Sequence, residues 1–146
     1  MKILVDADSC PVKDILFQVA QEYAVEVVVV KNLAHEIDHD YPKVITVDKG
    51  MDSVDFVIVN QTEAGDLVVT QDYGLAALAL SKQAVVIHPN GWEYTDGNIE
   101  GLLMNRHINR EIRKRDGRHT KTAKRKGEDD SQFEALLRAI IVKYQR

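Results

Sequence analysis

The 146-residue sequence has a single cysteine, Cys10, so the chain cannot form an internal disulfide. It also lacks a long hydrophobic run, because the apolar stretch 1–5 ends at Asp6 and is too short to target the chain or span a membrane. We therefore expect a cytoplasmic protein with no membrane association. Aromatic residues make up only 6% of the chain, and none lies between Tyr94 and Phe133.

The remaining composition is that of one globular domain over residues 1–146, with 45% hydrophobic and 29% charged residues. The net charge of -4 conceals an asymmetry. Residues 106–126 hold ten Lys and Arg against two acids, a charge of +8, so the rest of the chain carries -12. Only one part of the surface is therefore suited to a polyanion.

Hydrophobic periodicity predicts alternating strands and helices along the first 88 residues. We expect strands over 1–5, 25–30, 43–47, 67–70 and 84–87. Helices are expected from a Ser9 N-cap and Pro11 to Tyr23, and over 52–61, 73–82, 98–115 and 133–144, with a turn at 89–91 and a mobile basic loop over 116–130. The alternation predicts an α/β fold with a parallel sheet and helices on both faces.

Strand direction sorts the aspartates, because ligands of open parallel sheets bind outside the carboxyl ends of the strands. Asp6 ends the first strand, Asp8 follows it, and Asp72 lies just past the strand over 67–70. Asp66 precedes that strand, which places it at the opposite edge as a turn or cap residue.

Asp52 and Asp55 add two carboxylates in the first turn of one helix, three residues apart and on one face. Crowded carboxylates raise each other's pKa unless a positive charge lies between them. A hard cation such as Mg²⁺ or Mn²⁺ takes oxygen ligands of this kind and supports phosphoryl displacement. Alternatively, Asp6, Asp8 and Asp72 only cap helices at the turns between strands and helices.

Three segments together resemble the bacterial YaiI/YqxD family. They are Val5-Asp6-Ala7-Asp8-Ser9-Cys10-Pro11, Gly50-Met51-Asp52-Ser53-Val54-Asp55, and Gly65 to Ala76 with its Thr70-Gln71-Asp72 core. The resemblance covers nearly the whole chain and includes the Pro-x-Gly turn at 89–91. The family is grouped with PIN-like domains, which implies a three-layer sandwich with a central, mainly parallel sheet and, here, a C-terminal helical extension.

The same resemblance implies a metal-dependent ribonuclease with Mg²⁺ or Mn²⁺ as cofactor. Asp6, Asp55 with Ile58, and Thr70 with Asp72 match the PIN pattern, so Asp6, Asp55 and Asp72 are the implied metal ligands. Thr70 would orient the acid site, and Asp8 and Asp52 would be outer ligands or water-orienting groups. The usual further acid has no match in spacing, since Asp52 or Glu36 would have to serve. A catalytically silent nucleic-acid-binding or regulatory protein is the alternative.

Two other enzyme classes share local motifs with the chain. Asp6-Ala7-Asp8 resembles the opening of haloacid-dehalogenase-like phosphatases, which also need a late acidic pair such as Asp129-Asp130. The segment 35–39 reads H-E-x-x-H, which on a helix binds zinc, with Glu63 as a conceivable third ligand. Cys10 is expected to be a half-buried packing residue, because neighbouring aspartates disfavour a thiolate.

The basic stretch predicts a surface that tracks phosphates without reading sequence, with RNA as the expected partner. Its members recur at helical spacing and then continue into the expected loop. They are Arg106, Arg110, Arg113, Lys114, Arg118, Lys121, Lys124, Arg125 and Lys126. A solvated charged face is the alternative interpretation.

Overall fold

The computed structural model describes residues 1–34, 36–48, 51–116 and 127–145. The strands are β1 (Lys2–Asp6), β2 (Glu26–Asn32), β3 (Lys43–Val47), β4 (Leu67–Val69), β5 (Val85–His88) and β6 (Trp92–Tyr94). The helices are the short 3₁₀ helix η1 (Ala7–Ser9), α1 (Lys13–Glu22), α2 (Met51–Gln61), α3 (Tyr73–Ser81), α4 (Asp96–Asp116) and α5 (Gly127–Tyr144). The α/β alternation expected from the sequence is confirmed.

The six strands form one sheet in the order β3-β2-β1-β4-β5-β6. All pairs are parallel except β5 with β6, which is antiparallel. The chain moves outward from β1 in one direction to β3 and then returns to build β4 and β5 on the other side. The junction of β1 and β4 is therefore the topological switch point, where open α/β sheets bind their ligands.

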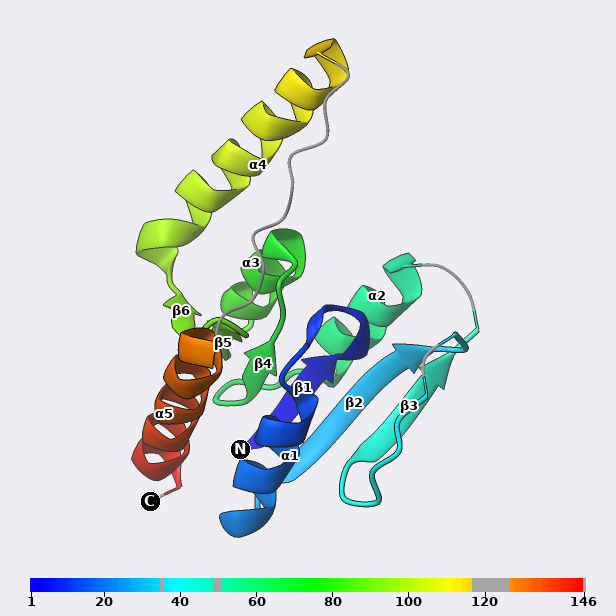
Figure 1. The fold of residues 1–146 in the computed structure, drawn as a ribbon, viewed down its shortest axis with the longest axis vertical. Helices are drawn as coiled ribbons and strands as arrows, with labels where there is room; N and C mark the ends of the chain where they lie inside the picture. Colours follow the sequence, from blue (N-terminus) through cyan, green and yellow to red (C-terminus); the bar gives the residue numbers. More distant parts are fainter. Residues whose placement is uncertain (35, 49–50, 117–126, 146) are drawn as a thin grey trace.

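Alternate residues of the buried central strands point to two separate cores, as in a sheet covered on both faces. One core combines Val5 and Val69 with side chains of α1 and α5. The other combines Leu4 and Val68 with side chains of α2, α3 and α4. Figure 1 shows α1 and α5 on one side of the sheet and α2 and α3 on the other. The result is a three-layer α/β sandwich consistent with a PIN-like fold.

β2 and β3 are parallel neighbours, yet no helix joins them among the described residues of 33–42. The described part of this connection is a loop without regular secondary structure on the α1 side of the sheet, where Ile37 and Tyr41 pack against the core. The Tyr41 hydroxyl donates a 2.6 Å hydrogen bond to the carbonyl oxygen of Val25. This bond fixes the loop where a crossover helix would usually lie.

The structure corrects several expected boundaries. Ser9 is not the N-cap of α1, which begins at Lys13, because its hydroxyl is used elsewhere. Strand β6 was not expected, and α4 begins at Asp96 because Thr95 and Asn98 cap its first turn reciprocally.

The loop expected over 116–130 also has different bounds. Helix α4 reaches Asp116, and the expectation is wrong for residues 127–130, which are the first turn of α5. Acids at 128–130 favour a helix N-terminus there. Residues 117–126 lie outside the described part.

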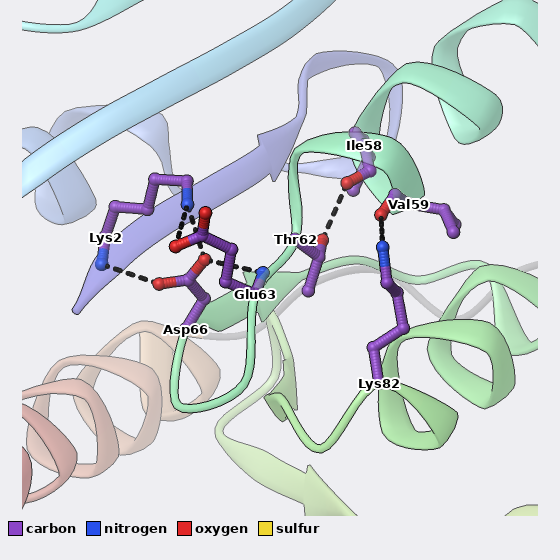
Figure 2. Close-up of polar contacts among 7 residues, drawn as sticks. All are labelled: Lys2, Ile58, Val59, Thr62, Glu63, Asp66 and Lys82. Carbon is purple, nitrogen blue, oxygen red and sulfur yellow. Dashed lines mark hydrogen bonds and ion pairs between the residues drawn. The ribbon is translucent and has the colours of Figure 1, made fainter.

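The amino-terminal edge of the sheet is closed by polar contacts (Figure 2). Asp66, which strand direction had placed at this edge, accepts hydrogen bonds from the Lys2 backbone at 3.1 Å and from Lys2 Nζ at 2.6 Å. Lys82 Nζ donates to the Val59 carbonyl oxygen at 2.6 Å and so ties the end of α3 to α2. Within the described residues, no helix combines the length and the apolar character needed to cross a membrane.

Candidate functional site at the carboxyl edge of the sheet

The carboxyl ends of β1 and β4 open on a cleft of about 680 Å³. Asp6 is the last residue of β1, and Asp72 follows β4 by three residues. Helices α2 and α3 supply the remaining wall. The lining consists of Asp6, Asp8, Ser9, Val54, Asp55, Gln71, Asp72, Tyr73, Gly74, Leu75 and Leu78. Four of the aspartates named from the sequence therefore share one cavity at the switch point.

Asp6 is the most buried of these acids, with 6% of its surface exposed. Its Oδ2 accepts a 2.9 Å hydrogen bond from the Ser9 hydroxyl and a long 3.5 Å one from the Thr70 hydroxyl. Burial raises the pKa of the Asp6 carboxyl, and the charges of Asp8 and Asp72 raise it further, against the opposing effect of the Ser9 hydrogen bond. The site therefore concentrates negative charge that favours a bound cation or proton.

Thr70 and Asp72 are linked through the turn that starts α3. The Asp72 backbone N–H donates to the Thr70 hydroxyl at 2.9 Å, and the Asp72 side chain caps α3. Asp72 Oδ1 accepts hydrogen bonds from the N–H groups of Gly74 at 2.9 Å and Leu75 at 3.2 Å. The capping alternative is thus correct for Asp72, but capping does not remove this half-buried carboxylate from the cleft wall.

The other acids occupy the rim. Asp8 is exposed, and its Oδ2 accepts a 3.3 Å hydrogen bond from the Asn32 side chain of β2. Asp55 is half-buried on α2 and faces the cleft from the opposite wall. Asp52 lies in the first turn of α2, but its side chain is outside the described part of the structure.

The residues that line the cleft suit a hard divalent cation, since they include four aspartates and neither His nor Cys. Among the described residues, the side chains do not bring three His, Cys, Asp or Glu groups together into a ready-made metal cage. Mg²⁺ keeps several of its waters and commonly uses only one or two protein carboxylates. The residues present therefore fit a water-rich ion held directly by one or two of Asp6, Asp55 and Asp72.

The basic residues divide between α4 and a segment outside the described part. Arg110 is exposed on α4, together with all described side chains from 104 to 111. Figure 1 shows α4 extending away from the three layers. The helical positions of Arg106, Arg113 and Lys114 lie on α4, but their side chains are outside the described part. Arg118, Lys121, Lys124, Arg125 and Lys126 are not described at all.

The Asp6-Ala7-Asp8 motif lines the cleft, but the zinc motif and the late acidic pair that a phosphatase needs lie away from it. Residues 36–39 are not helical, and His39 Nε2 lies 2.8 Å from Asp14 Oδ1, so the helix that H-E-x-x-H requires is absent from this described stretch. His35 is outside it. Glu63 lies at the opposite edge beside Lys2. Asp129 and Asp130 start α5, on the other face of the sheet from α2 and α3, and neither lines the cleft.

Cys10 is more buried than expected, with 2% of its surface exposed in the core beneath α1. Sequence reasoning also missed three polar participants near the site. Ser9 and Gln71 line the cleft, and Asn32 contacts Asp8. Ser9 was interpreted as a helix cap, and only its position directly after Asp6-Ala7-Asp8 hinted at a site role.

The fold and its acidic cleft define an α/β domain with four aspartates lining a cleft at the switch point of a mainly parallel sheet. The family described as "Uncharacterized BCR, YaiI/YqxD family" matches residues 4–143, and the chain belongs to that family. This finding confirms the resemblance noted in the sequence.

Relatives align over almost their full length. The chain is 70% identical to a UPF0178 protein of Natranaerobius thermophilus, over 97% of each chain. It is 57% identical to a UPF0178 protein of Alkaliphilus oremlandii, over 94% of this chain and 88% of the relative. A UPF0178 protein of Ruminiclostridium cellulolyticum is 48% identical over 97% of this chain and 92% of the relative. No solved structure matches the chain significantly.

Proposed function

We propose that the protein is a metal-dependent nuclease that hydrolyses phosphodiester bonds, with RNA as the preferred substrate over DNA. The observation that carries this proposal is the meeting of Asp6 and Asp72 at the ends of adjacent parallel strands, in one cleft with Asp8 and Asp55. The resemblance to PIN-like domains at Asp6, Asp55, Thr70 and Asp72 points to the same chemistry.

In this proposal Asp6, Asp55 and Asp72 hold Mg²⁺ or Mn²⁺, directly or through water. When bound there, such an ion would supply Lewis-acid chemistry, activating water and neutralising charge on the phosphoryl group. Asp8 and Asp52, at the rim and on α2, orient water, and the Thr70 hydroxyl holds Asp6 in place. An acidic cleft repels a polyanion, so phosphate binding also requires positive charge outside the cleft.

The basic residues of 106–126 provide that charge. Helix α4 packs against α3, whose first turn forms part of the cleft wall. A phosphate backbone held along α4 would therefore approach the cleft from the α3 side. Contacts of this kind are independent of base identity and weaken steeply as salt rises.

The deciding experiment measures cleavage of single-stranded RNA with and without Mn²⁺. Asp72→Asn is the sharpest variant, because asparagine keeps an oxygen that can cap α3 while the charge is lost. We expect Asp6→Asn and Asp72→Asn to abolish cleavage while RNA binding persists. Asp66→Asn is the matched control, since it removes an equally buried carboxylate at the opposite edge and should retain cleavage while folded.

Two results would contradict the nuclease proposal, and each would favour a different function. RNA binding with a steep salt dependence and no cleavage under any divalent metal would make the protein a binding or regulatory member of the class. Metal-dependent hydrolysis of a generic phosphomonoester, without action on RNA, would favour the phosphatase alternative.

A further inference from the structure

A serine hydroxyl outside the expected set of site residues occupies the centre of the polar network at the switch point. Ser9 ends the short helix η1 that follows β1, and its Oγ lies 2.9 Å from Asp6 Oδ2 and 3.3 Å from Thr70 Oγ1. The Gln71 backbone N–H donates to the same oxygen at 3.3 Å. One atom therefore contacts the last residue of β1 and the two residues that directly follow β4.

The direction of these hydrogen bonds is constrained. The Gln71 N–H can only donate, so it occupies an acceptor position of the Ser9 oxygen. An ionised Asp6 can only accept, so the single Ser9 proton is directed at Asp6 Oδ2, the shortest contact of the set. The Thr70 contact to the same carboxylate oxygen is 0.6 Å longer, by comparison of 3.5 Å with 2.9 Å, and is correspondingly weaker.

The turn that carries Ser9 is itself braced. Lys13 Nζ donates to the carbonyl oxygens of Ala7 and Cys10, both at 3.0 Å. The Gln71 side chain donates to the Ser9 carbonyl oxygen at 3.1 Å. Ser9 thus belongs to a turn fixed from both sides, which is what a group needs in order to hold another side chain in one rotamer.

We propose that Ser9 is a positioning residue that fixes the carboxylate of Asp6 for metal binding and couples it to Thr70 and the β4 turn. This inference rests on the proposed function of the cleft. The Ser9 hydroxyl engages Oδ2, and the Asp8 backbone also hydrogen-bonds this carboxylate, so the orientation of Asp6 depends on the turn that carries both residues. Groups that orient metal ligands in this way typically contribute about 10- to 100-fold to metal affinity or activity.

The test is Mn²⁺ binding, measured from the electron paramagnetic resonance signal of the free ion as it is titrated with the full-length protein. We expect Ser9→Ala to weaken Mn²⁺ binding by about 10- to 100-fold, and Ser9→Thr, which keeps the hydroxyl, to stay near the wild type. Thr62→Val is the matched control. It removes a hydroxyl that bonds the Ile58 carbonyl oxygen at 2.6 Å at the opposite edge, and it should not change Mn²⁺ affinity (Figure 2).

The outcomes separate the inference from the proposed function. If Asp6→Asn abolishes Mn²⁺ binding and Ser9→Ala leaves it unchanged, the positioning role is overturned and the metal site stands. If the wild type binds no Mn²⁺, the proposed function itself fails. Should Ser9→Ala not fold, Ser9→Cys keeps the size with a much weaker donor, and wild-type affinity in that variant would equally overturn the role.

An activity readout distinguishes positioning from simple loss of stability. A positioning defect should lower kcat for RNA cleavage at limiting Mn²⁺ and recover toward the wild-type value at saturating Mn²⁺, with KM for RNA little changed. A Ser9→Ala protein whose kcat stays low at every Mn²⁺ concentration would contradict this role.

Discussion

Asp6 and Asp66 are buried to nearly the same extent at opposite edges of one sheet, with 6% and 5% of their surface exposed, yet their pKa values shift in opposite directions. For Asp66, burial alone would raise the pKa, but hydrogen bonds from Lys2 and the Glu63 backbone and the Lys2 charge lower it overall. Among the described residues, no Lys or Arg forms an ion pair with Asp6, and its charged neighbours are acidic. The charge of Asp66 is therefore balanced by Lys2 within the fold. At the cleft edge, a bound cation would stabilise the ionised form of Asp6.

Replacing Lys2 with Met should destabilise the fold by about 3 kcal/mol at neutral pH, because it leaves the Asp66 carboxylate buried without its partner. The carboxyl pKa is lowered in the folded protein. Its contribution to stability is therefore present above the unfolded value of about 3.9 and disappears as pH falls through the folded value. Urea unfolding of both proteins should show the difference shrinking toward about pH 3.

Lys43→Met, at an exposed position on the edge strand β3, is the control for that experiment and should change stability little. A Lys2→Met deficit that stays constant from neutral to acid pH would contradict the electrostatic explanation.

Gly91 lies in close contact with the backbone of α5, so a substitution there tests how this helix packs. Its φ is +93°, and a Cβ there would lie 2.5 Å from the backbone carbonyl carbon of Gln132 and 2.6 Å from the backbone nitrogen of Phe133. Gly91→Ala should therefore cost well over the roughly 1–2 kcal/mol of left-handed backbone strain, because α5 must shift. Gly65→Ala is a matched control, with φ of +87° and nothing within 4 Å of its Cβ. Thermal unfolding that ranks the two variants equally would refute this packing.

Tyr94, in the unexpected strand β6, forms a hydrogen bond with Thr70 just before the cleft residues Gln71 and Asp72. Its buried hydroxyl donates a 3.1 Å hydrogen bond to the Thr70 carbonyl oxygen, and burial raises its pKa well above the usual range, so it stays protonated. Tyr94→Phe should cost about 1–2 kcal/mol in chemical denaturation, since a buried acceptor loses its donor. Tyr144→Phe, at an exposed position on α5, should cost almost nothing, and equal effects in the two variants would argue against the bond.

Neutralising basic residues of α4 should change the salt dependence of RNA binding and leave its sequence preference unchanged. Each of Arg110→Gln and Arg113→Gln is expected to lower the slope of log affinity against log salt by about one unit if it removes one phosphate contact. Lys143→Gln, on α5, controls for the change of net charge. Filter-binding titrations at several salt concentrations measure the slope, and an unchanged slope in both arginine variants would remove α4 from the RNA interface.

The sequence predicted correctly those features that burial and strand direction alone determine. The continuous apolar run before Asp6 indicated a buried central strand. The direction of the strand over 67–69 placed Asp66 and Asp72 at opposite edges of the sheet. Because parallel strands align their carboxyl ends, placing Asp6 and Asp72 together needed only the strand assignments.

The remaining features depended on contacts between distant segments. Strand β6 has only three residues and is stabilised by its antiparallel pairing with β5, so periodicity could not reveal it. Ser9 has the sequence context of a helix cap, and its actual partners Thr70 and Gln71 lie more than 60 positions away. Local propensity carries no information about a contact over such a separation.

Whether the aspartates of the cleft bind a metal ion can be read from the position of Mn²⁺ in crystals soaked with the ion, located by its anomalous scattering. We expect one ion in the cleft, bound directly through a carboxylate oxygen of Asp6 or Asp72, with water completing its coordination. An ion bound only elsewhere, or a cleft that takes up no Mn²⁺ at millimolar concentration, would contradict it.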